Sequence, residues 1–274
     1  MMTEIKNKYY SYSRLNTFEN CPQKYKIQYI DKIKSKNEGI EAFIGKRIHE
    51  SLEWLYENSN QNNFISFDRL ADKFDQLWIE KWHKNIYVAK NPYKRVSYTL
   101  NQNQYKKIAL NNLSLFYVKY FNHNNKTIYT ELKVKVDIDG YIFKGIIDRI
   151  DLDQDELYVI DYKTGKSKLK LTLLDKLQLY IYQLAVEKKY KNKKIYLSWY
   201  YVNSKNGVKK ISLNQKDKNK LNNKLLSILK NIEKSKYENK FPAKETLLCN
   251  WCYYWSQCSL KKDLNEKNPA ENLK

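Results

Sequence analysis

The chain has 274 residues, of which 42% are hydrophobic, so it can bury a substantial core and is not a disordered protein. Subtracting 30 acidic from 51 basic residues gives a formal net charge of +21, which favours a polyanionic partner such as nucleic acid. The heavy use of Lys, Asn, Ile and Tyr would also follow from an AT-rich genome. No segment approaches the ~20 apolar residues of a membrane span, and the first residues lack an apolar signal core, which indicates a cytoplasmic protein without a membrane partner.

The N-terminal part of the chain reads as helical. Residues 11–30 predict two short helices separated at Pro22, with Ser13 as the N-cap of the first and Cys21 at the junction. Residues 39–58 then place Ile44, Ile48, Leu52 and Leu55 at helical spacing, so His49 lies on the same long helix. Residues 64–125 continue with helical patterns interrupted around Asn91-Pro92.

The period of the pattern changes at residue 128. Apolar residues alternate with charged ones up to Ile138, as in a half-buried strand. Asp139-Gly140 is a hairpin signal, residues 141–151 predict the return strand, and residues 157–163 predict a third strand after a second turn. We therefore expect three consecutive antiparallel strands.

A helix over about 175–189 and a strand over 194–202 follow, and a strand reached through a helix can lie parallel to its neighbour. The prediction is an α/β fold with a mixed sheet. After Gly207 we expect a short strand, a long helix rich in Lys and Asn, and a cysteine segment at 249–258. The organisation is a single domain over 1–274: N-terminal helices (11–50), a helical insertion (51–126), an α/β core (127–215), a C-terminal helix with the cysteines (216–258) and a mobile tail (259–274).

Asp161 and Lys163 lie two residues apart on one predicted strand, so their side chains share a face. Asp148 stands on the preceding strand, across a tight turn. Two carboxylates beside a lysine suit a hard divalent cation such as Mg²⁺, which prefers oxygen ligands. Lys163 would then stabilise an attacking hydroxide or the charge that grows on a phosphoryl oxygen. An exposed, ion-paired strand end is the simpler alternative for this triplet alone.

Other polar residues recur near these positions in the chain. His49 follows Gly45 on a helix with an apolar face, where it could bind a metal or make a structural hydrogen bond. Gln178 and Tyr182 are four apart, hence on one helical face, and could bind a phosphate backbone.

The four cysteines are Cys21 and a C-x2-C-x5-C triplet of Cys249, Cys252 and Cys258. In a reducing compartment they are metal ligands or free thiols rather than disulfides. A structural zinc site usually takes two close pairs of ligands, whereas thiolates also suit iron-sulfur clusters. The neighbouring aromatic residues, Trp251, Tyr253, Tyr254 and Trp255, could shield a cluster or belong to the ordinary core.

Taken in order, the motifs are G-x3-H (Gly45 to His49), G-I-I-D-R-I-D (Gly145 to Asp151), I-D-Y-K-T-G (Ile160 to Gly165) and Q-x3-Y (Gln178 to Tyr182). With the opening S-Y-S-R-L-N-T-F-E-N-C-P-Q-K-Y, this order resembles the RecB-like branch of the PD-(D/E)xK nuclease superfamily, from about residue 11 to 258. The resemblance implies a restriction-endonuclease-like core. The acid before x-K is Asp161 rather than Glu, which the superfamily accepts.

The resemblance also implies roles for single residues. His49, Asp148, Asp161 and the backbone carbonyl of Tyr162 would be ligands of Mg²⁺ or Mn²⁺, and Lys163 the catalytic lysine. Gln178 and Tyr182 would position the DNA backbone. Glu131, on the strand before the hairpin, would be an acid behind the metal ligands.

One distant cysteine plus the C-terminal triplet resembles the 4Fe-4S clasp of iron-sulfur RecB-like nucleases, which include the AddB subunit of bacterial end-resection complexes and the CRISPR-associated nuclease of spacer acquisition. The resemblance implies a 4Fe-4S cluster on Cys21, Cys249, Cys252 and Cys258, with zinc as the alternative.

The function we expect is hydrolysis of DNA phosphodiesters to 5′-phosphate products by an exonuclease acting on single strands or DNA ends, in repair, recombination or CRISPR adaptation. The helical residues 52–125 could form a wall that admits only single strands. No G-x4-G-K-S/T loop is present, so a helicase motor or an integrase would be a separate protein. Two alternatives are a non-catalytic DNA-binding subunit of a helicase-nuclease or integration complex, and a zinc-stapled RNA-binding protein.

Overall fold

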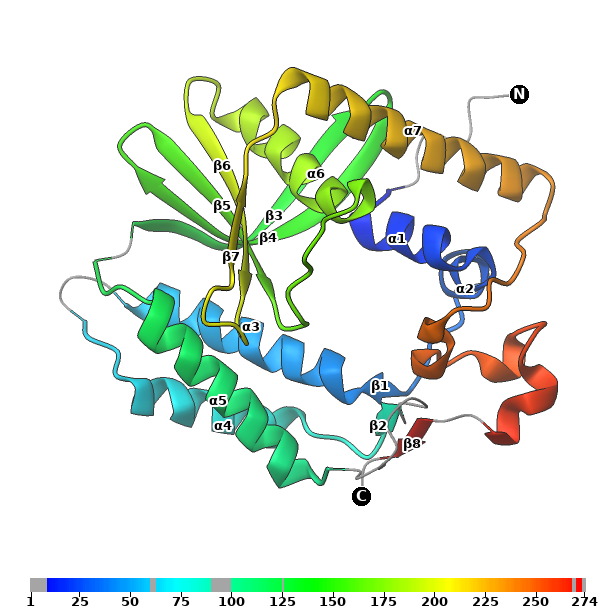
Figure 1. The fold of residues 1–274 in the computed structure, drawn as a ribbon, viewed down its shortest axis with the longest axis horizontal. Helices are drawn as coiled ribbons and strands as arrows, with labels where there is room; N and C mark the ends of the chain where they lie inside the picture. Colours follow the sequence, from blue (N-terminus) through cyan, green and yellow to red (C-terminus); the bar gives the residue numbers. More distant parts are fainter. Residues whose placement is uncertain (1–8, 60–62, 90–99, 125, 268–269, 273–274) are drawn as a thin grey trace.

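The computed structural model describes residues 9–59, 63–89, 100–124, 126–267 and 270–272. A five-stranded sheet separates two groups of helices (Figure 1). The first group, α6 and α7, covers one face of the sheet, and the second, α3, α4 and α5, packs against the other. The predicted mixed α/β fold is confirmed. Among the described residues, no helix has the length and apolar character that crossing a bilayer requires.

The large sheet has the order β3-β4-β5-β6-β7. Its first three strands are antiparallel, β6 is parallel to β5, and β7 returns antiparallel. Asp139 and Gly140 both have positive φ, as a tight hairpin turn between β3 and β4 requires. The strands span β3 Thr127–Ile138, β4 Tyr141–Asp153, β5 Glu156–Lys163, β6 Lys194–Tyr201 and β7 Val208–Ile211.

The first core lies between the sheet, α6 (Leu173–Lys189), α7 (Gln215–Tyr237) and the short helix α1 (Tyr12–Asn20). The N-cap of α1 is Ser11, whose hydroxyl accepts a hydrogen bond from the Arg14 amide at 3.3 Å. The prediction of Ser13 was wrong, because Ser13 lies inside the first turn. The predicted junction is confirmed: Cys21 ends α1 and caps α2 (Pro22–Tyr25), which continues into the π-helical turn Lys26–Ile30.

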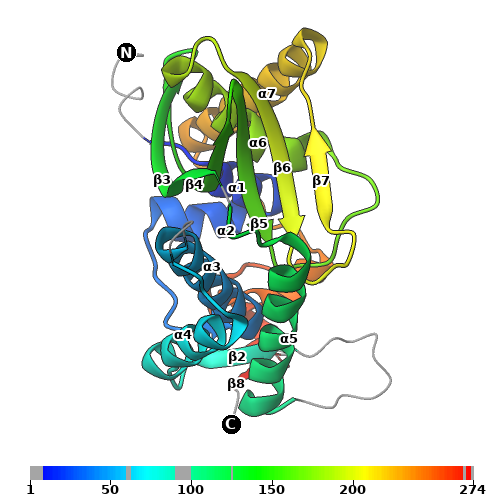
Figure 2. The same ribbon diagram turned by 90° about the vertical axis from the view of Figure 1, so that its left-hand side faces the viewer.

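The second core joins α3 (Ile40–Asn58), α4 (Phe67–Lys81) and α5 (Gln102–Tyr120) to the opposite face of the sheet. Figure 2 shows these helices gathered beneath the strands. Alternation along β5 divides its side chains between the two cores: Leu157 and Val159 face the first, Ile160 and Tyr162 the second. The predicted interruption at Asn91-Pro92 lies outside the described residues.

The C-terminal part returns toward the start of α3 (Figure 1). It contains the 3₁₀ turns Leu247–Trp251, Trp255–Gln257 and Lys262–Lys267. A last strand, β8 (Ala270–Asn272), pairs antiparallel with β2 (Ile86–Ala89), which also pairs with β1 (Glu38–Gly39). The mobile tail predicted for residues 259–274 stays a prediction, although residues 270–272 pair with the edge of β2 in the structure.

Arg149 connects the sheet to the helical layer. Its side chain is 4% exposed and ion-paired, with 3.0 Å between Arg149 Nη2 and Asp151 Oδ2. Arg149 Nη1 donates to the hydroxyl of Tyr162 at 3.0 Å, and the guanidinium carbon lies 3.9 Å from the ring centroid of Tyr56 on α3. A buried charge requires such partners because removing it from water costs several kcal/mol.

We predict that Arg149→Met lowers the free energy of unfolding by about 3 kcal/mol, because it leaves a buried tyrosine hydroxyl and Asp151 without their partner. We use the low end of the usual range since the Asp151 side chain is 20% exposed. Urea unfolding measures this change. Lys126→Ala, which removes an exposed ion pair with Asp153, is the control and should cost less than about 1 kcal/mol. Equal effects of the two substitutions would contradict a linking role for Arg149.

Candidate active site

The site lies where strands β4 and β5 separate. Their paired residues run from Asp153 and Glu156 up to Arg149 and Ile160, and no further. Just beyond this point the Tyr162 amide donates to Asp148 Oδ2 at 2.6 Å. The carboxylate of Asp148 thus takes the place of a backbone acceptor that β4 no longer supplies. The end of the pairing fixes Asp148 beside Asp161.

Three potential ligands from three elements meet at this point. The ligand atoms of His49 on α3, Glu131 on β3 and Asp148 on β4 all lie within 4.8 Å of one another. His49 Nδ1 is 3.5 Å from Asp148 Oδ1. Burial lowers the pKa of His49, but the contact with Asp148 outweighs this effect and the pKa is raised overall. Helix α3 can come this close because Gly45 has no side chain: a Cβ there would lie 3.2 Å from the hydroxyl of Thr164.

Glu131 adopts a backbone conformation that L residues rarely take, with φ of 44°. Such a conformation costs on the order of 1 kcal/mol and persists where the surrounding structure imposes it. Burial and the charge of Asp148 raise the pKa of Glu131 to about 7. The sequence placed Glu131 behind the metal ligands, whereas the structure brings it directly to His49 and Asp148.

Asp161 and Lys163 form an ion pair, with 2.6 Å between Lys163 Nζ and Asp161 Oδ2. Asp161 is only 2% exposed, and burial raises its pKa to about 6 although Lys163 acts in the opposite direction. Gln178 on α6 joins the pair, since its Nε2 donates to Asp161 Oδ1 at 2.8 Å and its Oε1 accepts from Lys163 at 2.8 Å. Both side chains therefore have fixed orientations.

Tyr182 lies behind this network and is 6% exposed. Its hydroxyl accepts a hydrogen bond from Gln178 Nε2 at 3.0 Å. A Cβ on Gly145 would lie 2.8 Å from the Tyr182 ring, so only glycine leaves room for it. The DNA contact predicted for Gln178 and Tyr182 stays a prediction; in the structure Gln178 donates to both Asp161 and Tyr182. Gly145 begins the G-I-I-D-R-I-D motif of the sequence. The motif alone does not reveal the physical need for a glycine at this position.

The carboxylates face an open pocket of about 710 Å³ between α3 and the sheet. Its walls include His49, Glu131 and Asp148, together with Gly45, Thr164 and the acids Glu41, Glu50 and Glu53. Oxygen ligands with one imidazole, in a pocket with excess negative charge, are a donor set that fits a divalent cation. The raised pKa values of Glu131 and Asp161 mean that their charged forms are disfavoured. A bound cation would stabilise both charged forms.

The four cysteines form a second group. They line one pocket of about 210 Å³ together with Trp251 and Trp255, whereas Tyr253 and Tyr254 line a different pocket. All four thiols are free. Burial raises the pKa of Cys252. Two of the sulfurs accept backbone hydrogen bonds, Cys21 from Lys24 at 3.5 Å and Cys249 from Thr246 at 3.4 Å.

The sulfur atoms are not tightly gathered. In the described part of the chain, which contains all four cysteines, the only group with three ligand atoms within 4.8 Å of one another is His49, Glu131 and Asp148. Sulfurs on one tetrahedral zinc lie roughly 3.8 Å apart, as the Zn–S length of about 2.3 Å requires.

Comparisons with known proteins give one matching family and two solved structures to report. A solved structure from Eubacterium rectale, described as a candidate exonuclease, superposes with a TM-score of 0.51 at 11% identity and covers 93% of this chain and 92% of its own. A second structure, SSO0001, gives a TM-score of 0.33 at 16% identity, with 95% and 98% coverage. No curated protein matches the chain. The model of the PD-(D/E)XK nuclease superfamily matches residues 9–259. The predicted restriction-endonuclease-like core is confirmed, and the chain belongs to the PD-(D/E)XK nuclease superfamily.

Proposed function

We propose that the protein is a Mg²⁺- or Mn²⁺-dependent deoxyribonuclease that hydrolyses phosphodiester bonds to give 5′-phosphate products. The observation that carries the proposal is the convergence of His49, Glu131 and Asp148 in an open pocket, together with the ion pair between buried Asp161 and partly exposed Lys163. A lysine next to a divalent-cation site is suited to phosphoryl chemistry, because negative charge grows on phosphoryl oxygens in the transition state.

The proposed metal ligands are His49, Asp148, Asp161 and the backbone carbonyl of Tyr162, with Glu131 as a further acid at the same place. When bound, the cation supplies charge stabilisation and lowers the pKa of a water molecule. Asp148 has a second task, since its Oδ2 holds the amide of Tyr162. Asp161 is kept in place by Gln178 from the side opposite the pocket.

Lys163 is the residue to which we assign stabilisation of the reacting phosphate. Its ammonium group is held by Asp161 and Gln178 and keeps 34% of its side chain exposed, so it can contact a substrate. Tyr182 supports it indirectly through Gln178. We therefore assign Gln178 and Tyr182 a positioning role, in addition to the DNA contact expected for Gln178.

The substrate we propose is single-stranded DNA or a DNA end, cut exonucleolytically in repair, recombination or CRISPR adaptation, in the cytoplasm and alongside a separate helicase or integrase. The net charge of +21 supports a polyanionic substrate, and α3, on which α4 and α5 pack, forms one wall of the pocket. A non-catalytic DNA-binding subunit would not need Asp161 and Lys163 in a fixed, buried pair. A zinc-stapled RNA-binding protein would need neither this pair nor the His49 group.

We also propose that Cys21, Cys249, Cys252 and Cys258 hold a 4Fe-4S cluster. Four free thiols around one pocket support it. Amide hydrogen bonds to Cys21 and Cys249 suit sulfur atoms that carry negative charge. Such a cluster joins the two ends of the chain, and a covalent cross-link of similar span contributes roughly 5 kcal/mol.

We predict that Lys163→Ala lowers the rate of cleavage of end-labelled single-stranded DNA by at least about a hundredfold, because it removes the charge facing the phosphate. DNA binding should change little, since many phosphate contacts contribute to it. Lys170→Ala, which removes an exposed lysine from the following loop, is the control and should cleave normally. Full activity of the Lys163 variant would refute the assignment.

We predict that His49→Ala raises the concentration of Mg²⁺ or Mn²⁺ needed for half-maximal activity, because one ligand is lost. Metal titrations of the cleavage rate measure this. His123→Ala is the control, since His123 stacks on Phe64 away from the carboxylates. If His49 were only structural, its replacement would lower the melting temperature and leave the metal requirement unchanged.

We predict that anaerobically purified protein is brown and contains about four irons per chain. Cys21→Ser should lose colour, iron and thermal stability together. Serine keeps the N-cap hydrogen bond that Cys21 provides to α2, so a loss of stability would report the missing thiolate rather than the missing cap. A colourless protein with about one zinc, or a Cys21→Ser variant with full iron and unchanged melting, would contradict the cluster.

A further inference from the structure

The active-site pocket shares lining residues with two further pockets. It shares Ala42 and Lys46 with a pocket of about 560 Å³ near the start of α3. It shares Lys133 with a pocket of about 280 Å³ between β3 and α6. His49, Glu131 and Asp148 thus line the central one of three neighbouring pockets, which together are called the depression below.

The first flanking pocket is basic. Lys34 and Lys36 stand on the exposed segment that precedes β1, and neither pairs with a carboxylate in the part of the chain that the structure describes. The half-buried rings of Tyr29 and Tyr253 add apolar surface to the same pocket. Lysines with neighbouring aromatic rings are the usual lining of grooves that bind single-stranded nucleic acid.

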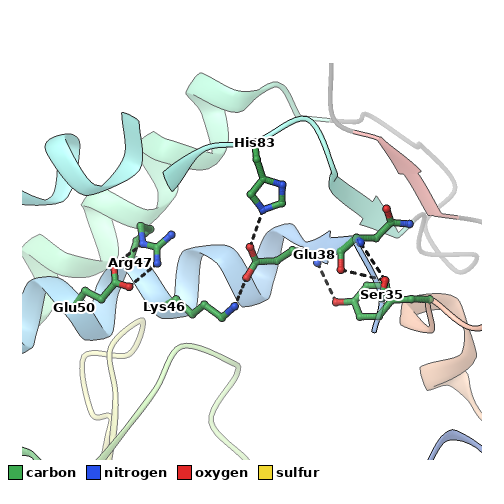
Figure 3. Close-up of polar contacts among 9 residues, drawn as sticks. Ser35, Glu38, Lys46, Arg47, Glu50 and His83 are labelled. Atoms are coloured by element: carbon green, nitrogen blue, oxygen red, sulfur yellow. Dashed lines mark hydrogen bonds and ion pairs between the residues drawn. The ribbon is translucent and has the colours of Figure 1, made fainter. Parts of the chain in front are cut away.

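The acid in this pocket already has two partners. Figure 3 shows the carboxylate of Glu38 between a lysine and a histidine: its Oε1 lies 2.6 Å from Lys46 Nζ and its Oε2 lies 3.1 Å from His83 Nε2. These contacts lower the pKa of Glu38, against the effect of burial. Lys46 is 63% exposed and lines both pockets, so it can contact a phosphate that passes from one to the other.

The second flanking pocket is basic as well. Its lining contains Lys133 and Lys135 on β3 and Lys188 and Lys189 on α6, all four exposed. Lysines on an edge strand also prevent pairing with other chains, which explains those on β3. Protection of an edge strand does not explain Lys188 and Lys189, which lie on α6 and line the same pocket.

The charges therefore alternate along the depression, with lysines at both ends and acids in the middle. A polyanionic strand would gain at the two ends, where its phosphates meet lysines. In the middle it needs a cation between its phosphate and the acids. Resting on the proposed function, we propose that the protein binds single-stranded DNA on both sides of the reacting phosphate: one flank on Lys34, Lys36 and Lys46, the other on Lys133, Lys135 and the α6 lysines. The strand passes through the active site instead of ending there.

The test measures binding of oligothymidylate by fluorescence anisotropy at several salt concentrations, in a Lys163→Ala background that does not cut the probe. Each lysine that contacts a phosphate of a single strand contributes about 0.7 to the slope of log K against log salt. Lys34→Ala with Lys36→Ala, and Lys135→Ala with Lys188→Ala, should each lower that slope by about 1.4. Lys216→Ala with Lys220→Ala removes the same charge from the exposed start of α7 and should leave the slope unchanged.

Cleavage by the otherwise unmodified protein separates the possible outcomes. Each flanking pair of substitutions should raise KM for a long strand with kcat retained, and should leave cleavage of dithymidine monophosphate unaffected, because a dinucleotide cannot reach the flanks. Flanking pairs that behave like the α7 control, or a duplex that shows the same loss of slope as the single strand, would overturn the proposal. If the slopes fall as expected but no DNA is cut by the unmodified protein, the strand path stands and the nuclease function fails.

Discussion

The constraint on which this structure depends is the burial of three carboxylates, Glu131, Asp148 and Asp161, around the point where β4 and β5 separate. Like charges in a region of low dielectric repel each other and disfavour ionisation, and the raised pKa values of Glu131 and Asp161 record that cost. The protein offsets it with one lysine, which pairs with Asp161, and with an imidazole and an amide, which both contact Asp148. These partners leave the side of the acids that faces the pocket free to bind a cation. The crowding of negative charge that disfavours ionisation would then favour metal binding.

The partners of the acids are themselves fixed by residues of little chemical reactivity. Gly45 lets α3 approach β5 closely enough for His49 to reach Asp148. Gly145 makes room for the ring of Tyr182, whose hydroxyl orients Gln178, and Gln178 orients both Asp161 and Lys163. Gly45 and Gly145 thus affect the positions of His49 and Gln178 through packing contacts alone. A methyl group at Gly145 would displace a ring rather than a reacting atom, yet Lys163 would move with it.

Period and order in the sequence were enough to predict the sheet, because alternation from residue 128 and the Asp139-Gly140 turn leave little freedom in pairing. They also predicted His49, Asp148, Asp161 and Lys163 as one site, and the structure contains two contacting pairs among them, His49 with Asp148 and Lys163 with Asp161. The sequence pattern did not predict the directions in which the side chains of Glu131 and Gln178 point. The left-handed backbone at Glu131 turns its carboxylate toward His49, and a period-two pattern carries no sign of that twist. Gln178 turns inward instead of outward for a similar reason, since its helical face depends on the packing of α6. Strand β8 was missed because its pairing partner, β2, lies far away in sequence.

The cysteine segment and the active site are joined through the first turn of α3. The Tyr253 hydroxyl accepts a hydrogen bond from the Gly39 amide at 3.0 Å, and Trp251 Nε1 donates to Glu41 at 3.4 Å. Tyr87, from β2, donates to the Trp251 carbonyl at 3.1 Å. Helix α3 continues from this anchored turn to His49 as one rigid element, so a shift of the cysteine segment would be transmitted to the metal ligands. The cysteine segment and the carboxylate site therefore contact the same helix, the first at its N-terminal turn and the second through His49.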